Sequence, residues 1–213
     1  MFTGIIEEIG TIKNMKQSSK SMELSIQANK VLADVKIGDS ISVNGTCLTV
    51  TGYSQHQFEV DVMPETFQHT SLKQLSVGTS VNLERAMAAN GRFGGHFVTG
   101  HIDGMGTIVT MKTVENAVYI KIQLPESISK YFIEKGSVAV DGTSLTVFGV
   151  EGDMITVSLI PQTRFDTILG HKKIGDLVNI ECDMMAKYLY QFSKGKETTS
   201  SISKDYLREN GFL

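Results

Sequence analysis

Residues that can transfer protons gather in a glycine-rich stretch near the middle of the chain, residues 94–104. It contains His96, His101 and Asp103 among four glycines. Imidazole gains and loses a proton near neutral pH more readily than any other unperturbed side chain. Glycine lets the backbone come close to a ligand. The stretch therefore predicts a site for acid–base chemistry on a small molecule, with a solvated or structural role for each histidine as the alternative.

A second set of reactive side chains lies on two short and nearly identical segments. Cys47 and Thr49 occupy the first segment, and Ser144 and Thr146 occupy the equivalent positions of the second. Residues two apart on a β-strand share a face. Each segment therefore presents two thiol or hydroxyl groups on one wall, which suits hydrogen bonding to a polar heteroaromatic ring. Cys47 is either a thiol beside the ligand, acting as nucleophile or weak donor, or a small buried hydrophobe.

The sequence does not indicate metal or nucleotide chemistry. The histidines lack a Cys-x-x-Cys or His-Glu-x-x-His frame for zinc. Residues 91–95 lack the Lys-Ser/Thr ending of a P-loop, and Val109 stands where a dinucleotide fingerprint that begins at Gly104 needs its third glycine. We expect no metal and no cofactor.

The elements that position these residues occur twice. Residues 43–50 and 140–147 differ at only two of eight positions, and residues 81–84 return as residues 178–181 at the same spacing. A period this long indicates a duplicated domain rather than a solenoid. Two similar pockets in one chain favour a protein that handles two similar ligands.

Short β-rich runs separated by glycine or polar turns make up each repeat. Asn44-Gly45 and Asp141-Gly142 each lie between two such runs, which is the strongest short signal for a β-hairpin. About six strands in each repeat, with few helices, favour a sandwich or a small closed barrel. We expect a short helix to begin at Pro64 and another at Pro161, because proline suits the first helical turn.

The C-terminal tail has no counterpart after the first repeat. Residues 184–192 carry apolar side chains at helical spacing, namely Met185, Tyr188, Leu189 and Phe192. A polar link over residues 194–201 and a short final helix over residues 202–213 are expected to follow. The apolar stripe packs either on its own barrel or in an oligomer.

Composition is that of an ordinary globular protein. The chain has 213 residues, 41% of them apolar, and a net charge of −3, which argues against a nucleic-acid partner. No apolar run approaches the ~18 residues of a membrane span, and no secretory signal is visible. The two cysteines, Cys47 and Cys182, are not expected to form a disulfide. We expect a cytoplasmic protein.

Four segments together resemble one family: residues 1–6, 44–50, 94–104 and 135–147. The chain is similar to the riboflavin synthases of the alpha-chain type, the lumazine-binding repeat family, over its whole length. The resemblance implies an all-β fold of two tandem six-stranded Greek-key barrels and a C-terminal α-helix. It implies a first lumazine-binding barrel over residues 1–96, a second over residues 97–186, and an oligomerisation tail over residues 187–213.

The resemblance also implies an activity and partners. Each barrel would bind one 6,7-dimethyl-8-ribityllumazine, and transfer of a four-carbon unit between the two would give riboflavin and 5-amino-6-ribitylaminouracil without an added cofactor. A homotrimer held by the tail is implied, with the active site between the first barrel of one subunit and the second barrel of a neighbour. Association with lumazine synthase stays open, as does the assignment of donor and acceptor.

By the same resemblance the catalytic residues are Cys47, His96, His101, Lys135, Asp141, Ser144 and Thr146, with Asp183 a further candidate and Phe2 lining the first pocket. The substrate-binding residues implied for the first barrel are Gly4, Ile5, Ile6, Cys47, Leu48, Thr49, Asp61, Val62, Met63, Pro64, Glu65 and Thr66. Those implied for the second barrel are Gly100, His101, Ile102, Lys135, Ser144, Leu145, Thr146, Ser158, Leu159, Ile160, Pro161, Gln162 and Thr163.

Two other classes of protein share related folds. Lumazine and yellow fluorescent antenna proteins resemble this fold but lose much of the cysteine and histidine set, whereas Cys47, His96 and His101 are all present here. A flavoprotein reductase would need a nucleotide-binding domain, for which a chain filled by two repeats has no room. The enzyme is therefore the leading hypothesis, and a non-catalytic lumazine- or flavin-binding protein is the alternative.

Overall fold

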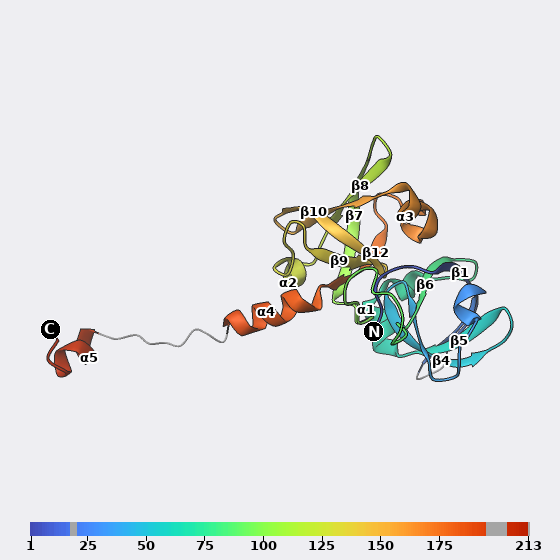
Figure 1. Ribbon diagram of the computed structural model, residues 1–213, viewed down its shortest axis with the longest axis horizontal. Coiled ribbons are helices and arrows are strands. Elements are labelled where there is room, and N and C mark those ends of the chain that lie inside the picture. The colour runs from blue at the N-terminus through green and yellow to red at the C-terminus, as the bar shows by residue number, and fades with distance from the viewer. Residues whose placement is uncertain (18–20, 195–203, 213) are drawn as a thin grey trace.

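The computed structural model describes residues 1–17, 21–194 and 204–212. They form two closed antiparallel β-barrels that pack side by side, followed by helix α4 (Figure 1). The duplicated sequence thus folds as two barrels rather than as a sandwich. The predicted polar link over residues 194–201 falls almost entirely outside the described residues.

The first barrel has the strand order β1-β2-β5-β4-β3-β6. Neighbours β3, β4 and β5 form consecutive hairpins and β6 returns beside β1, as in a Greek key. Its elements are β1 (Glu8–Gln17), β2 (Met22–Gln27), the 3-10 turn η1 (Lys30–Leu32), β3 (Ser40–Val43), β4 (Thr46–Tyr53), β5 (Gln57–Val62), α1 (Pro64–His69), η2 (Ser71–Gln74) and β6 (Ser80–Arg85).

The second barrel repeats this arrangement with the order β10-β11-β8-β7-β12-β9. Its elements are β7 (Gly104–Val114), β8 (Ala117–Gln123), α2 (Glu126–Ser129), β9 (Ser137–Val140), β10 (Thr143–Glu151), β11 (Met154–Leu159), α3 (Pro161–Asp166), η3 (Ile168–His171) and β12 (Leu177–Cys182). Helices α4 (Met184–Lys194) and α5 (Lys204–Glu209) complete the described chain.

The predicted hairpins and proline-led helices are confirmed. Asn44 and Gly45 both have positive φ, 48° and 82°, and Asp141 and Gly142 have 44° and 80°. Two consecutive residues in this region form the tight turn that matches the twist of paired strands. Helices α1 and α3 begin at Pro64 and Pro161, and a 3-10 turn follows each.

Apolar side chains fill the interior of each barrel. Alternate residues of every strand point inward and form two separate clusters, one around Phe58 and Leu83 and one around Ile122 and Val157. Because the interiors are packed, a ligand must bind on the outside of the barrels. Both cysteines are free thiols, as expected. No helix among the described residues has the length and apolar character needed to cross a bilayer.

A symmetrical polar network joins the barrels where their two turns meet. Asn82 of β6 donates its backbone N–H to the side chain of Asn44 (2.8 Å) and its amide to the carbonyl of Asp141 (2.9 Å). Asn179 of β12 does the reverse: its N–H bonds to Asp141 (2.8 Å) and its amide to the carbonyl of Asn44 (2.8 Å). Each asparagine is buried. The repeated segments 81–84 and 178–181 therefore hold the two halves together.

Candidate functional site

The reactive strand residues face outward. In β4, Leu48 is buried, while Cys47 is half-buried and Thr49 is exposed. In β10, Leu145 is buried, while Ser144 is half-buried and Thr146 is exposed. The prediction that each pair shares one face is confirmed, and the face lies on the outer surface of its barrel. Because the strand alternates, the outer wall is polar where the inner wall is apolar.

The segments that complete each wall come from the opposite half of the chain. The backbone N–H of Ser144 donates to the carbonyl of Gly4 (2.7 Å), and that of Cys47 donates to the carbonyl of Gly100 (2.9 Å). The grouping implied by the resemblance, in which residues 4–6 share a barrel wall with Cys47, is therefore wrong. The chain crosses over before β1 and before β7, so each N-terminal segment lies on the other barrel.

We name the two walls by their central residues. The Ser144 half-site comprises residues 4–6 and 144–146, and the Cys47 half-site comprises residues 100–102 and 47–49. The remaining predicted ligand-contacting segments, residues 158–163 and 61–66, run along the strands next to β10 and β4 into α3 and α1. The substrate-binding residues predicted from the sequence thus fall into one half-site or beside it, except Phe2, which is fully buried. Lys135 lies beside the Ser144 half-site through its contact with Val147.

Glycine is required where the segments touch. Gly4 has φ +77°, and a Cβ there would lie 2.6 Å from Cβ of Ser144. Gly100 has φ +84°, and a Cβ there would lie 2.5 Å from Cβ of Cys47. Real Cβ contacts are never so short, and positive φ disfavours other residues. The close approach brings backbone groups of residues 4–6 and 100–102 to the edge of each wall.

His96 completes the Ser144 half-site. Its Nδ1 lies 2.7 Å from Oγ of Ser144, and the residue is only 8% exposed. Its Nε2 is buried and has no hydrogen-bond partner among the described residues. Burial lowers the pKa of His96 and a nearby carboxylate, Asp183, opposes the shift. The imidazole is therefore neutral near pH 7 and can accept a proton from the serine hydroxyl.

His101 lies in the other half-site and differs in its surroundings. It is exposed, and its backbone N–H donates to Oγ1 of Thr99 (3.3 Å). It occupies the position that Ile5, 49% exposed, holds in the Ser144 half-site. The structure thus distributes the two predicted histidines between the half-sites instead of bringing them together.

The two charged candidates from the second repeat are placed apart from each other. Lys135 is exposed, and its backbone N–H donates to the carbonyl of Val147 (2.7 Å), next to Thr146. Asp141 is fully buried at the seam between the barrels. Its carboxylate accepts the N–H of Asn179 and pairs with Lys172 (3.3 Å). Asp141 therefore does not reach the wall that Ser144 presents.

Phe2 lies behind the wall that carries Cys47, and Asp183 is half-buried just before α4. Phe2 is fully buried and packs with Val98, Ala139 and the half-buried Cys47. It pairs with Val98 in an isolated antiparallel bridge. Asp183 precedes α4 and accepts the N–H of Met185 (2.8 Å).

Sequence reasoning missed two buried glutamates, Glu84 and Glu181, which contact the segments that carry Gly4 and Gly100. The available signal was the repetition of glutamate at the end of both copies of the segment 81–84. A glutamate in a strand would ordinarily be a solvated residue.

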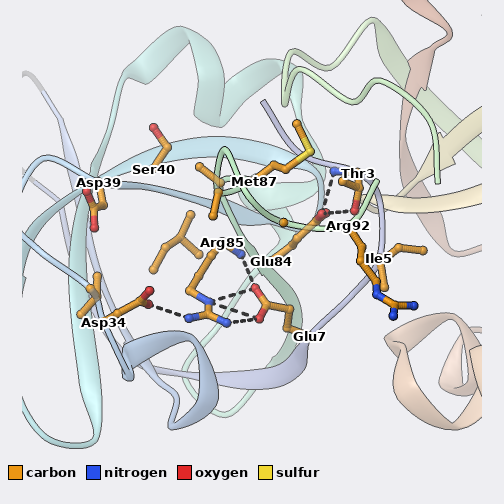
Figure 2. Close-up of a pocket in the computed structure, with 15 residues that line it drawn as sticks. Thr3, Ile5, Glu7, Asp34, Asp39, Ser40, Glu84, Arg85, Met87 and Arg92 are labelled. Atoms are coloured by element: carbon orange, nitrogen blue, oxygen red, sulfur yellow. Dashed lines mark hydrogen bonds and ion pairs between the residues drawn. The ribbon is translucent and has the colours of Figure 1, made fainter. Parts of the chain in front are cut away.

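A cavity of about 500 Å³ lies on the flank of the first barrel, away from most of the predicted site (Figure 2). Arg85 lies in it between Glu7 and Asp34, at 2.5 and 2.6 Å. Of the predicted substrate-binding residues only Ile5 lines it. Arg85, Glu7 and Asp34 in this cavity are already paired with one another, and the cavity contains none of the reactive side chains predicted from the sequence, so it does not replace the outer walls as the candidate site. Among the described residues there is no cluster of three groups that would hold a metal ion.

Comparison with known proteins agrees with this geometry. The lumazine binding domain family matches residues 3–86 and 99–183. The riboflavin synthase of Bacillus subtilis (strain 168) is 54% identical over the full length of both chains. Solved structures of LumP complexed with riboflavin and with 6,7-dimethyl-8-(1'-D-ribityl) lumazine have TM-scores of 0.79 and 0.77 at 26% identity, covering 85% of this chain and 99% of LumP. With its two matched repeats and two outward walls, the chain belongs to the lumazine binding domain family.

Proposed function

We propose that the protein is a riboflavin synthase. It converts two molecules of 6,7-dimethyl-8-ribityllumazine into riboflavin and 5-amino-6-ribitylaminouracil by transfer of a four-carbon unit. The observation that carries the proposal is the pair of half-sites: the same backbone frame occurs twice, as a reaction between two identical ligands requires. The 54% identity to a riboflavin synthase over the whole chain supports the same activity.

Ligand binding follows from the groups that each wall exposes. Thr49 and Thr146 offer hydroxyl groups, and the backbone beside Gly4 and Gly100 offers N–H and C=O groups at close range. A lumazine carries alternating donors and acceptors on its pyrimidine edge and hydroxyl groups on its ribityl chain. LumP, whose fold is similar, has been solved in complex with riboflavin and with the lumazine. We assign the same ligands to these half-sites.

Ser144 and His96 supply the proton transfer that starts the reaction. The 7-methyl group of the lumazine is acidic because its anion is delocalised into the ring. In this step the methyl C–H bond breaks and its proton passes to Oγ of Ser144, while the serine proton passes to Nδ1 of His96. The 2.7 Å separation suits this relay, and the lowered pKa of His96 keeps the imidazole in the neutral form that can accept a proton.

Cys47 faces the second lumazine in the equivalent place. Its side chain is half-buried, and no histidine lies within hydrogen-bond distance of it among the described residues. We assign it a thiol contact to the ring, while Lys135 supplies a positive charge at the rim of the Ser144 half-site and His101 supplies a polar group at the rim of the Cys47 half-site. Asp141 supports the turn before Ser144 from the seam.

Two lumazines react only when held face to face, which can lower the barrier by about 7–11 kcal/mol in the best cases. We propose that the Ser144 half-site of one copy faces the Cys47 half-site of another in a homotrimer. Apolar side chains at the half-sites are open to solvent in the single chain, including Met63 (67%) and Ile160 (59%). A second copy would cover them.

The tail supports the same assembly. Helix α4 is held to its own barrel by Lys187, which pairs with Asp103 (3.0 Å), and by Tyr190, whose ring contacts Tyr131 edge-on. The stripe predicted from the sequence stays exposed, from 54% at Met185 to 69% at Phe192. An apolar helix face of this kind is buried in an oligomer. We therefore assign the stripe to the trimer.

Three finer assignments belong to the same proposal. The barrels divide the chain at residues 1–96 and 97–186, with residues 187–213 as the oligomerisation tail. The protein works in the cytoplasm, where its free thiols stay reduced. Association with lumazine synthase, which would supply the substrate directly, is compatible with the exposed surfaces.

The test is turnover with the lumazine alone. Purified protein mixed with 6,7-dimethyl-8-ribityllumazine, without any added cofactor, should produce the absorbance and fluorescence of riboflavin. Tight binding of the lumazine without product at high protein concentration would instead identify a non-catalytic binding protein, the second candidate favoured by the similarity to LumP.

A further inference from the structure

Two buried carboxylates hold the segments that complete the half-sites, and the proposed reaction does not yet use them. Glu84 lies on β6 and is 4% exposed; Glu181 lies on β12 and is 1% exposed. Neither forms an ion pair within the part of the chain that the structure describes. A buried carboxylate is costly unless its oxygens receive hydrogen bonds.

Glu84 receives three hydrogen bonds from a single dipeptide. Its Oε1 accepts the backbone N–H of Thr3 (2.7 Å) and the hydroxyl of Thr3 (2.8 Å), and its Oε2 accepts the N–H of Gly4 (3.0 Å). Figure 2 shows Glu84 directed toward Thr3. Burial raises the pKa of this carboxyl and the three donors oppose the rise.

Glu181 repeats the arrangement on the other barrel. Its Oε1 accepts the N–H and the hydroxyl of Thr99, both at 2.6 Å, and its Oε2 accepts the N–H of Gly100 (2.9 Å). The same donors meet the same oxygens in both halves. The same glutamate, threonine and glycine contacts therefore occur beside both ligand walls, which indicates that the two glutamates have the same role.

Each carboxylate acts across the seam between the barrels. Glu84 belongs to the first barrel, but the dipeptide that it holds carries Gly4, whose carbonyl accepts the N–H of Ser144 on the second barrel. Glu181 in turn holds Gly100 against Cys47. The glutamate lies on one side of the segment and the reactive strand on the other.

We propose that Glu84 and Glu181 are positioning residues, one for each half-site. Glu84 fixes the backbone of residues 4–6 for the ligand at the Ser144 half-site, and Glu181 fixes residues 100–102 for the ligand at the Cys47 half-site. This inference rests on the proposed function, since it assigns both residues to lumazine recognition.

The chemistry requires a carboxylate in particular. Glutamine has the same shape but only one oxygen, so its NH₂ group would face an N–H donor of the threonine or of the glycine. That segment would lose at least one charge-assisted hydrogen bond, which is stronger than a hydrogen bond between neutral groups. The loss corresponds to a roughly 10- to 100-fold weaker site.

The experiment compares Glu84→Gln with Glu181→Gln in the full-length protein. Riboflavin, which binds without reacting, is titrated into each variant, and intrinsic flavin fluorescence gives the affinity of both half-sites. We expect one affinity to fall about 10- to 100-fold in each variant and the other affinity to stay at the value of the unmodified protein. The variant Glu115→Gln, at an exposed carboxylate in the turn between β7 and β8, is the matched control and should leave both affinities unchanged.

Double variants identify which half-site is affected. Glu84→Gln combined with Ser144→Ala should give a non-additive loss, because the two residues act on the same ligand, whereas its combination with Cys47→Ala should be additive. Glu181→Gln should show the opposite pattern. A purely structural role would weaken both half-sites together and would show no such preference.

The outcomes separate this inference from the proposed function. Absence of turnover in the unmodified protein would contradict the function, while riboflavin binding would still test the glutamates. Equal weakening of both half-sites, or unchanged affinities in folded variants, would overturn the inference. If Glu84→Gln fails to fold, Thr3→Val removes only the hydroxyl donor; it should weaken the Ser144 half-site alone, and unchanged binding there would also overturn it.

Discussion

The Ser144 and Cys47 half-sites have the same backbone frame and different side chains. Both have a glycine of positive φ pressed against a strand, and both have a buried glutamate behind that glycine. The Ser144 hydroxyl has an imidazole at 2.7 Å, whereas no imidazole of the described residues lies within hydrogen-bond distance of Cys47. The frame thus recognises one ligand shape twice, and the side chains divide the chemistry.

The difference arises from the connection between the barrels. His96 lies in the segment that leads from β6 to β7, and this connection exists only once in the chain. After β12 the chain enters helix α4 instead. A tandem duplication therefore cannot give two identical half-sites, because one repeat is followed by a linker and the other by the tail.

Replacing Gly4 or Gly100, the glycines at which the two segments contact the opposite barrel, should have the largest effect on turnover. Gly4→Ala places a Cβ at 2.6 Å from Cβ of Ser144 and Gly100→Ala places one at 2.5 Å from Cβ of Cys47. Each change also imposes positive φ on alanine, at a cost of about 1–2 kcal/mol before the overlap is relieved. We expect each variant to lose turnover and to lose riboflavin binding at one half-site. Retained activity in Gly4→Ala would show that residues 4–6 do not form the Ser144 half-site.

Removing the tail should have the next largest effect. A chain ending after residue 186 lacks Tyr188, Leu189 and Phe192 of the exposed stripe, so we expect a monomer with little turnover, because two half-sites no longer meet. Mass measurement by light scattering gives the state of assembly, and riboflavin titration shows whether single half-sites still bind. A trimer from the shortened chain would refute the role given to α4.

The two histidines should differ in their contribution to the rate. General acid–base groups contribute about 10²- to 10⁴-fold, so His96→Ala should lower kcat within that range. His101→Ala should have a smaller effect that appears mainly in KM, because His101 is exposed and at the rim. Steady-state kinetics of both variants provide the measurement. Equal losses of kcat would contradict the division of labour between the half-sites.

The pH dependence offers a second measurement on His96. Its folded-state pKa lies below the unfolded value of about 6.5. As the pH falls, the unfolded protein therefore binds a proton at His96 before the folded protein does. The contribution of neutral His96 to the stability of the fold is complete above about pH 6.5 and is lost as the pH falls toward the folded-state pKa. kcat should be level near neutral pH and fall on the same acidic side. His96→Gln should remove this acid limb, and an unchanged limb would assign it to another group.

Cys47→Ser should have the smallest effect. It makes the Cys47 half-site carry the same hydroxyl as the Ser144 half-site, without the histidine. We expect a loss of turnover well below that of His96→Ala, because the serine keeps a donor at the wall. Single-turnover kinetics measure it. Complete loss of activity would show that the thiol is a required nucleophile.

Local signals made much of the fold predictable from the sequence. Asn44-Gly45 and Asp141-Gly142 specify tight turns by their own backbone preferences, and Pro64 and Pro161 specify helix starts. The matched octets place Cys47 and Ser144 at equivalent strand positions. These features depend on neighbouring residues alone, so the hairpins, the helix starts and the pairing of residues on one strand face follow from the pattern, whereas the choice of closed barrels over a sandwich came from the family resemblance.

Features that depend on distant contacts were not predictable in this way. Nothing in the residues around Gly4 indicates that it lies against Ser144 on the other barrel. The grouping of residues 4–6 with Cys47 is wrong for this reason. From its sequence context Glu84 is expected to be a solvated strand residue. Only the fold brings Thr3 within hydrogen-bond distance of its carboxylate. The sequence around Asp141 indicates an ordinary turn residue. In the structure this turn lies at the seam between the barrels, and the Asp141 carboxylate pairs with Lys172.

Complementation between two inactive variants tests the central claim most directly. Gly4→Ala damages the Ser144 half-site and Gly100→Ala damages the Cys47 half-site, so neither protein alone should form riboflavin. If the two half-sites of an active site come from different copies, unfolding the two variants together and refolding them should restore turnover, because some interfaces then combine two intact half-sites. The account would be contradicted if the mixed trimers had no turnover although each variant still bound riboflavin at one half-site.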